Sequence, residues 1–482
     1  METSVRRLGP QVLLATPIPP MATGLATYAL RVLEYTSHVI PWKVAYPEGG
    51  DPESLPAGVQ SIPLGDLTFE DLPSTRFFAL GNSPHCYDIL LLLRRFGGAA
   101  VMHETVLHHM LRHCSLERDR WEDYLQALVF EYGPGAKRAQ RTLNRRGRSQ
   151  ADFDSLLKSY PLVGRAVNAS RMLLCLNCHA AAELRGRAGV RPVLQIGHPL
   201  SPVEDPVPQS PPGSPVIGMA GSFHFGRNLQ TVVEAVGRLR GDHPKAVLVL
   251  AGGGYPQGLP EWVVCTGRLP EAEYQGWIRS FDIGVDVRHP SCGETSGSLL
   301  EVMRAGVPCV VSDSGAFACL PSASVLRLPA EGLERTLQRS LARLLDQPRR
   351  AELLGEKAME YARREGSASR AVEDWTRAVS IYPHPAQPSP PRPSLAAAWH
   401  DPPPGATVDR KGDAVEWVVG KELELVGPDW ARGAWVSVSG DGEVNGIAMT
   451  PERRVLRVSG GVLRFTGPGR LTAVTWLGGD DG

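Results

Sequence analysis

The chain of 482 residues, 42% of them hydrophobic, is long enough to form two or three domains with their own cores. Its 51 Lys and Arg side chains balance 51 Asp and Glu, which excludes an overall field that would gather nucleic acid or an anionic membrane. The longest aliphatic run, ILLLL at 89–93, is far shorter than the roughly 18 residues of a membrane-spanning helix. The N-terminus carries no cleavage region of the secretory type, so we expect a cytoplasmic protein with at most peripheral contact to the inner face of the membrane.

Eight cysteines at irregular spacings are typical of reduced thiols in the core and loops rather than of a disulfide framework. The segment CLNCH at 175–179 matches the spacing of covalent haem attachment, but it lies between a strand pattern and a helix pattern, and haem attachment requires export. No second ligand pair stands at a spacing that would complete a zinc site. We therefore expect neither a haem cofactor nor a zinc site here.

The first 205 residues alternate short apolar runs with helix-patterned segments. A strand pattern at 11–16 precedes a helix pattern at 24–35, and the pairs 76–82 with 86–97 and 99–104 with 105–114 repeat this order. Such alternation predicts a parallel sheet covered by helices on both faces, in a domain at 1–205. The proline-rich stretch at 202–215 is expected to be a hinge.

The same alternation restarts after the hinge and predicts a second doubly wound domain at 214–382. Strands are expected at 214–222, 245–254, 261–267, 281–287 and 306–313, separated by helices that include 228–241, 271–280 and 297–306. The fold class is thus α/β, with two tandem Rossmann-like domains. Because such sheets bind ligands at the carboxyl ends of their strands, we expect the functional site in a cleft between the domains.

The chain changes character after residue 382. Residues 383–405 are rich in proline and predict an extended linker. Residues 406–482 contain short alternating runs punctuated by glycine, which predict a small all-β module.

The segment SCGETSGSLLEVMRAGVPCVVSD at 291–313 combines a loop of small residues with a helix and a buried strand. Amides of Thr295, Ser296 and Gly297 at the start of that helix suit an anionic group such as a diphosphate. Glu301, further along the helix, could accept hydrogen bonds from a pair of hydroxyls. A diphosphate next to a diol describes a nucleotide. An ordinary capped helix with a solvent-facing glutamate explains the same pattern and stays open.

These residues resemble family 4 of the retaining glycosyltransferases, which has the GT-B fold. The hallmark of that family is two glutamates separated by seven residues ahead of an Ala-Gly-x-Pro-Val-Val strand, and LLEVMRAGVPCVVSD resembles the second half. The first half departs from it, because Gly293 stands at the expected position and Glu294 follows. The GETSG sequence resembles a variant in a branch of bacterial members. The resemblance implies that Glu301 binds ribose and that Glu294 contacts the sugar.

Three further segments, in the order of the family, extend the resemblance over roughly 15–380. In GMAGSFHFGRNLQ, Gly221 begins the loop, Arg227 stands where the family carries a lysine that neutralises the donor diphosphate, and Ser222 replaces the usual arginine. The glycine-containing loop at 17–33, which includes Gly24, is implied to face the donor phosphates and the acceptor. The turn at 81–83 and His103 match the family's Gly-Asn-Ser and His-Asp segments.

The resemblance implies transfer of a sugar from a nucleotide-diphosphate sugar to a glycan, lipid-linked or other hydroxyl acceptor, without a metal. We expect Arg227, Glu294 and His103 to be catalytic, with Arg227 stabilising charge on the leaving phosphate. His103 packed at a strand end is the structural alternative. The donor would be bound by a set of loop and helix residues: Gly24, Gly221, Ser222, Arg227, Gly267, Arg268, Thr295, Ser296, Gly297 and Glu301.

Two other functions stay open: a nucleotide-sugar 2-epimerase of the same fold and a non-catalytic carbohydrate-binding protein. The basic segment at 135–150 could hold an anionic lipid-linked acceptor or rest on a membrane, but it lacks an apolar companion face. We therefore interpret it as a solvated helix face and loop. No nucleic-acid partner is expected. The C-terminal module is expected to fold by itself and to serve acceptor binding or partner recruitment, or to be a passive appendage.

Overall fold

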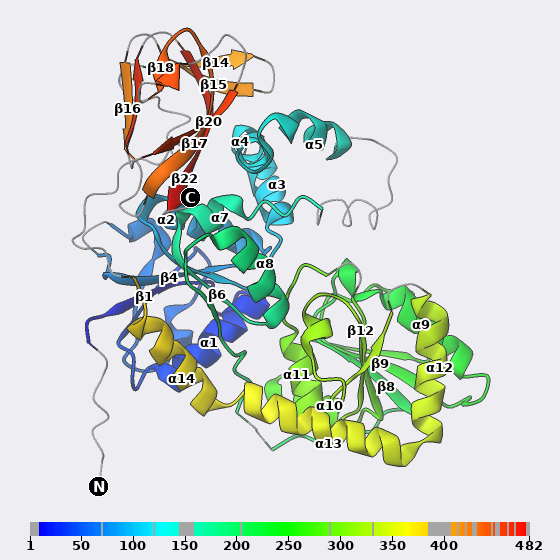
Figure 1. Ribbon diagram of the computed structural model, residues 1–482. Helices are drawn as coiled ribbons and strands as arrows, with labels where there is room; N and C mark the ends of the chain where they lie inside the picture. The colour runs from blue at the N-terminus through cyan, green and yellow to red at the C-terminus, as the bar shows by residue number, and fades with distance from the viewer. Residues whose placement is uncertain are drawn as a thin grey trace. The chain divides into compact units, whose positions relative to one another are not determined.

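The computed structural model describes residues 9–68, 71–118, 121–143, 159–202, 205–288, 291–329 and 332–383, and strand segments between 406 and 478. The chain forms two compact units (Figure 1). The first comprises Met1–Cys175, Ala181–Gln195 and Trp375–Gly482, and the second comprises Leu176–Ala180 and Ile196–Asp374. These limits differ from the predicted ranges 1–205 and 214–382 because the chain passes between the units at four points rather than at one hinge.

A parallel seven-stranded sheet forms the centre of the first unit, in the order β3-β2-β1-β4-β5-β6-β7. Its strands are β1 (Val12–Ala15), β2 (Trp42–Tyr46), β3 (Gln60–Pro63), β4 (Thr75–Leu80), β5 (Gly98–Met102), β6 (Ser170–Cys175) and β7 (Val193–Gln195). The central strands β1, β4 and β5 are buried along their whole length, as expected for a parallel sheet with both faces covered.

The described helices of the first unit lie between its strands in sequence, and several of them stand between β5 and β6. They are α1 (Gly24–Thr36), α2 (Tyr87–Phe96), α3 (His108–Glu117), α4 (Trp121–Tyr132), α5 (Ala136–Leu143), α7 (Gly164–Ala169) and most of α8 (Cys178–Ala188). Helix α1 buries the face predicted from its periodicity, including Leu25, Tyr28 and Val32. It begins at Gly24 because the Thr23 hydroxyl accepts a hydrogen bond from the amide of Ala26 at 3.1 Å. Of the basic segment 135–150, residues 144–150 lie outside the described residues.

The last helix of the α/β region, α14 (Ala368–Ser380), returns the chain to the first unit. Trp375 is fully buried, with its ring 5.4 Å from that of Trp42 and 5.2 Å from that of Phe77, both edge to face. Tyr382 adds a further edge contact to Phe77 at 5.6 Å. This aromatic cluster ties the end of the α/β region to strands β2 and β4.

The second unit contains a parallel six-stranded sheet in the order β10-β9-β8-β11-β12-β13. Its strands are β8 (Val216–Ala220), β9 (Val247–Ala251), β10 (Val263–Gly267), β11 (Ile283–Asp286), β12 (Cys309–Ser312) and β13 (Leu326–Leu328). Its helices are α9 (Leu229–Leu239), α10 (Glu271–Arg279), α11 (Gly297–Arg304), α12 (Leu333–Asp346) and α13 (Pro348–Glu365). Alternate residues of β9 enter two separate hydrophobic clusters, Val247 and Val249 in one and Leu248 and Leu250 in the other. The sheet is therefore covered on both faces, as predicted.

The C-terminal region forms two antiparallel sheets, β14-β15-β22-β17-β20 and β16-β21-β18-β19. The strands are β14 (Ala406–Lys411), β15 (Ala414–Val419), β16 (Glu422–Val426), β17 (Ala431–Gly440), β18 (Glu443–Val444), β19 (Ile447–Ala448), β20 (Arg454–Ser459), β21 (Val462–Thr466) and β22 (Gly469–Gly478). The predicted all-β module is confirmed. The predicted linker at 383–405, except for its first residue, lies outside the described residues.

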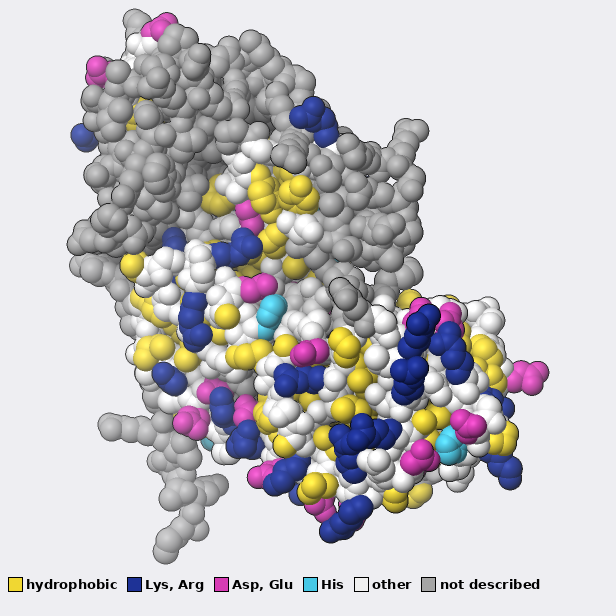
Figure 2. Space-filling model, turned by 45° about the vertical axis from the view of Figure 1, so that its right-hand side comes forward, with side chains coloured by type: hydrophobic (Ala, Val, Ile, Leu, Met, Phe, Trp, Pro, Cys, Tyr) yellow, Lys and Arg dark blue, Asp and Glu magenta, His cyan; other side chains and the backbone are white. Residues whose placement is uncertain are grey.

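On the face drawn in Figure 2, basic, acidic and apolar side chains are interspersed over the described residues, in agreement with the zero formal net charge. The most exposed large apolar side chains come from separate elements and loops: Leu116, Val190, Val207, Leu353 and Ile381. Among the described helices, none is both long and apolar enough to cross a bilayer.

Candidate functional site

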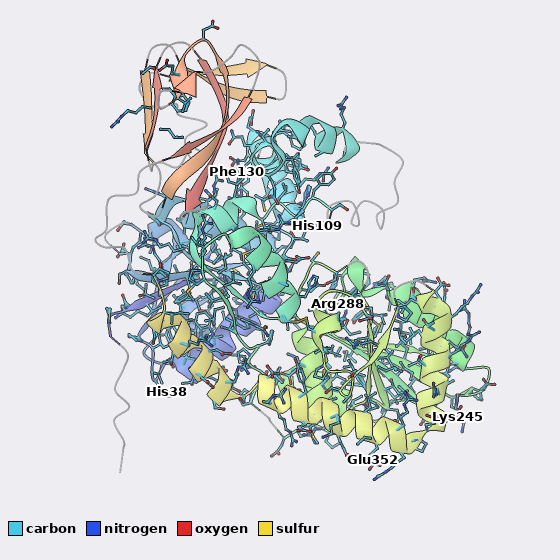
Figure 3. The ribbon with its side chains drawn as sticks, viewed as in Figure 1. His38, His109, Phe130, Lys245, Arg288 and Glu352 are labelled. Carbon is cyan, nitrogen blue, oxygen red and sulfur yellow. A yellow bond between two sulfur atoms is a disulfide. The ribbon has the colours of Figure 1, made fainter. Side chains whose placement is uncertain are left out.

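The candidate site of the second unit lies where the parallel strands β8, β9 and β11 end. Because all strands of this sheet run the same way, the loop segments 221–228, 252–254, 287–288 and 291–296 lie at one edge. Figure 3 labels Arg288 at this edge, away from Lys245, which precedes β9. Most residues predicted to bind a nucleotide fall in these loops and in the start of α11.

The loops after β8 and β9 pack backbone against backbone. A side chain at Gly252 would place its Cβ 2.3 Å from the carbonyl oxygen of Gly221, and the amide of Phe223 donates to the carbonyl of Gly253 at 2.9 Å. Gly221 itself has φ +98°, and a Cβ there would lie 2.7 Å from Ser298 Oγ. The predicted residue Gly221 therefore brings the first loop against the start of α11.

Helix α11 begins at a buried serine. Ser296 has an extended backbone, and its hydroxyl accepts a hydrogen bond from the amide of Leu299 at 3.2 Å. The amides of Gly297 and Ser298 belong to the first turn, where a helix offers no intrahelical acceptor. A Cβ at Gly297 would lie 2.8 Å from the ring of His198, and burial lowers the pKa of that histidine to about 4. The first turn of α11 thus packs closely against a neutral histidine ring, and its binding of an anion stays a prediction.

Arg288, which the sequence analysis missed, joins the end of β11 to the start of α11. Its guanidinium donates to both carboxylate oxygens of Asp286 at 3.1 Å, to Glu294 Oε1 at 3.1 Å and to Ser296 Oγ at 2.8 Å. Burial acts to lower the pKa of Arg288, but the two carboxylates outweigh it and raise the pKa. In the sequence, Arg288 could be recognised only as a basic residue after a buried strand. Its hydrogen-bond partners could not be predicted.

Glu294 is held inside its loop. In addition to Arg288, its Oε2 accepts hydrogen bonds from the amide of Cys292 at 2.6 Å and the hydroxyl of Ser291 at 3.3 Å. Burial acts to raise the pKa of Glu294, but Arg288 outweighs it and holds the pKa below its usual value, so the side chain is ionised at neutral pH. Gly293 has φ +77°, a conformation that a glutamate at this position would adopt only with strain.

Arg227 has an exposed fraction of only 1% and lies beneath the loop that follows β8. Its guanidinium donates to the carbonyls of Ala220 at 2.5 Å and Ser222 at 3.3 Å and lies 3.4 Å from Asp286 Oδ1. Burial acts to raise the pKa of Asp286, and Arg288 and Arg227 together lower it well below its usual value. In this arrangement Arg227 stabilises the loop and neutralises Asp286. Its contact with a donor phosphate stays a prediction.

Glu301 lies on the buried side of α11. Its Oε1 accepts a hydrogen bond from the amide of Ser201 at 3.2 Å, and its Oε2 accepts one from Gln275 Nε2 at 3.2 Å and pairs with Arg304. Burial raises its pKa, which Arg304 offsets only in part. A carboxylate offers about four acceptor positions, so the protein occupies three and one on Oε1 remains. Its contact with a ribose diol stays a prediction.

The remaining predicted residues of this unit differ in their surroundings. Thr295 Oγ1 accepts a hydrogen bond at 2.9 Å from Asn177, which precedes α8 and was not predicted. Gly267 has φ +70° at the end of β10, and Arg268 follows it on the surface. Among the described residues, no group of three or more His, Cys, Asp or Glu is arranged to hold a metal ion.

Gly24 and His103 belong to the first unit. Gly24 begins α1, and a Cβ there would meet no atom within 4 Å. His103 follows β5, where its amide donates to Leu80 and its ring, buried, lies edge-on to that of Tyr28 at 4.7 Å. These surroundings are compatible with a histidine that only packs at the strand end and also with one that contacts a sugar. His109, which is labelled in Figure 3, was not predicted as a site residue. Its Nδ1 lies 2.7 Å from Asn82 Nδ2, in the turn after β4.

Residues 214–347 match the model of the family described as Glycosyl transferases group 1. A sucrose-phosphate synthase from Thermosynechococcus elongatus is similar in structure, with a TM-score of 0.53 and 14% identity over 77% of this chain and 98% of that chain. WaaG, a glycosyltransferase involved in lipopolysaccharide biosynthesis, has a TM-score of 0.49 and 13% identity over 77% of this chain and 99% of that chain. No curated protein sequence matches the chain.

The likeness to the synthase confirms the predicted GT-B fold, and at this identity it shows the fold alone. The family match covers strands β8 to β13 and helices α9 to α12. The part of the chain that carries the candidate site is therefore similar to group 1 glycosyltransferases.

Proposed function

We propose that the chain transfers a sugar from a nucleotide-diphosphate sugar to a hydroxyl acceptor, as a retaining glycosyltransferase of family 4. The observation that carries this proposal is the start of α11, where helix amides and the Ser296 cap stand one turn before the Glu301 carboxylate. The amides of Thr295, Ser296 and Gly297 would bind the diphosphate, and the remaining acceptor position of Glu301 would bind a ribose hydroxyl.

In the proposed reaction, the acceptor oxygen forms a bond to the anomeric carbon as the bond to the leaving phosphate breaks. The acceptor proton moves to the leaving phosphate, whose charge the helix start stabilises. Glu294, which is fixed and ionised by Arg288, would accept hydrogen bonds from sugar hydroxyls. The proposal needs no metal and extends to a glycan or lipid-linked acceptor in the cytoplasm.

The test is incubation with a panel of nucleotide-diphosphate sugars, with and without glycan acceptors, followed by measurement of released nucleotide diphosphate and of the product anomer. We expect release that depends on the acceptor and a product that keeps the donor's anomeric configuration. Formation of an isomeric sugar without acceptor would indicate a 2-epimerase instead.

A non-catalytic carbohydrate-binding role is favoured by one observation. Ser222 replaces the usual arginine, and the Arg227 guanidinium is turned towards carbonyls and Asp286. Binding of nucleotide sugars without any release, for every acceptor tried, would support that role and contradict transfer.

A further inference from the structure

A disulfide between Cys178 and Cys319 joins two distant segments of the second unit, 141 residues apart in sequence. The expectation of reduced thiols is wrong for this pair. Cys178 is the first residue of α8, and Cys319 ends the short helix Gly315–Cys319, which follows β12. Neither spacing nor periodicity in the sequence relates these two cysteines, so only the fold could pair them.

The Cys178 side of the disulfide holds the described residues between β11 and α11, 287–288 and 291–296, which we call the β11–α11 loop. Asn177, the neighbour of Cys178, is buried and donates from Nδ2 to the carbonyl of Gly293 and to Thr295 Oγ1, both at 2.9 Å. Asn177 Oδ1 also accepts from the amide of Ala180 at 2.8 Å, which fixes its orientation at the start of α8. A shift of Cys178 would therefore move two anchors of this loop.

The Cys319 side holds the same loop at its other end. The Ser314 hydroxyl donates to the carbonyl of Arg288 at 2.8 Å, and the Arg288 guanidinium lies 5.3 Å above the ring centre of Phe317. Gly315 approaches Ser291 so closely that a Cβ on the glycine would lie 2.2 Å from Ser291 Oγ. The disulfide thus connects the two segments that hold the β11–α11 loop from either side.

One end of the disulfide lies at the surface. Cys178 is exposed and Cys319 half-buried, whereas four of the six free cysteines are buried: Cys86, Cys114, Cys175 and Cys309. Exposed disulfides are more often the labile, regulatory ones than buried disulfides are. The exposed Cys178 therefore lies next to the loop that the proposed function uses.

We propose that Cys178–Cys319 is a redox-active site that reacts with a dithiol reductant and thereby controls the order of the β11–α11 loop. One thiolate of the dithiol attacks Cys178 Sγ, the bond between the two protein sulfurs breaks, and Cys319 leaves as a thiolate that takes up a proton. The second thiol then closes the reductant into its own disulfide and releases Cys178 as a thiol. Two electrons move from the dithiol to the protein.

The effect on binding rests on the proposed function. If a nucleotide-diphosphate sugar binds only the ordered loop, reduction lowers the apparent affinity by the fraction of ordered protein that is lost. The coupling is reciprocal, so bound donor makes the disulfide harder to reduce by the same factor. We expect a weakening of about tenfold, which corresponds to a shift of about 30 mV in the midpoint potential of this two-electron couple.

The experiment uses the full chain in the oxidised state and after treatment with dithiothreitol. Alkylation and mass spectrometry identify the thiols that appear, and hydrogen–deuterium exchange measures the amides of residues 291–300 without any ligand. We expect reduction to expose Cys178 and Cys319 and to speed exchange in that segment. Calorimetry with a nucleotide-diphosphate sugar then measures the tenfold change in affinity.

Two variants give matched comparisons. The double variant Cys178→Ser with Cys319→Ser should resemble the reduced protein and should not respond to dithiothreitol. The variant Cys265→Ser removes an exposed cysteine outside the pair and should respond as the natural chain does. If the wild-type chain, as isolated under air, has Cys178 and Cys319 as thiols, or if loop exchange is equal in both redox states, the inference is overturned. Absence of nucleotide-sugar binding in both states, with a redox-dependent exchange rate, would instead contradict the proposed function.

Discussion

The Glu301 side chain shows how burial and neighbouring charges together set what one residue can do. Burial raises its pKa and Arg304 only partly offsets this, so the folded-state pKa lies above that of the unfolded chain. Such a carboxyl contributes stability at low pH that is lost as pH rises through the raised pKa. Ionisation at higher pH nevertheless makes the side chain a better acceptor for a ligand hydroxyl.

We predict that affinity for a nucleotide-diphosphate sugar rises with pH through the raised pKa of Glu301. The variant Glu301→Gln should bind the donor more weakly by about 2 kcal/mol at neutral pH, because it loses a hydrogen bond to a charged acceptor. Calorimetric titrations at several pH values test both points. An unchanged pH dependence in the variant would remove Glu301 from the binding site.

Arg288 combines four hydrogen bonds in one planar group, which lysine cannot reproduce. We predict that Arg288→Lys lowers the free energy of unfolding by about 3 kcal/mol, because buried Asp286 and Glu294 lose part of their partner. Urea denaturation of the full chain measures the change.

The matched control is Arg349→Lys. Arg349 pairs with Glu352 at 2.7 Å, but its side chain has an exposed fraction of 91%. A surface pair of this kind contributes about 0.5 kcal/mol or less. Equal losses in the two variants would show that the Arg288 cluster does not stabilise the second unit.

At the scale of elements, periodic patterns predicted the strands and helices well. The ranges 24–35 and 297–306 correspond to α1 and α11, and the strand predicted at 281–287 contains β11. Strands β2 and β3 were not singled out. Strand β3 lies at the edge of the sheet, is mostly exposed and contains no apolar run.

Contacts between segments far apart in the chain could not be predicted from the sequence, for a different reason. Asn177 lies 116 residues before Gly293, and Gln275 lies 26 residues before Glu301. Each pairing depends on the order of the strands in the sheet, and a local sequence pattern does not predict that order. The sequence could therefore predict which loops carry the site, but not which side chains orient it.

Alanine substitutions at two glycines of the second unit distinguish the effect of close packing from that of helix propensity. A Cβ at Gly218 in β8 would lie 2.0 Å from the ring of Phe281, which is itself buried, so Gly218→Ala should destabilise the unit by about 2 kcal/mol. Gly237, exposed in α9, would place its Cβ 3.5 Å from Trp262, an ordinary contact. Gly237→Ala should therefore stabilise by about 0.5 to 1 kcal/mol. Thermal unfolding compares the two, and a shift of the same sign would contradict the packing argument.

For the whole molecule, the position of α14 decides where the α/β region ends. Trp375 and Tyr382 pack on Phe77 of the first sheet, although the preceding helix α13 belongs to the second unit. The second Rossmann-like unit therefore ends before Trp375, and the segment that follows contributes to the core of the first unit.

We predict that a chain ending at Pro383 keeps both parallel-sheet units folded, because it retains Trp375 and Tyr382. A chain ending at Gly366 lacks α14 and should unfold the first unit at lower temperature, since burial of a large aromatic ring is worth about 3 kcal/mol or more. Circular dichroism and calorimetric melting of the two truncated chains, compared with the full chain, measure this difference.

The β module after the proline-rich segment is predicted to fold by itself, so its removal should leave donor turnover intact and reduce only the use of large acceptors. If the chain ending at Pro383 melts as early as the one ending at Gly366, the C-terminal strands are part of the core of the first unit.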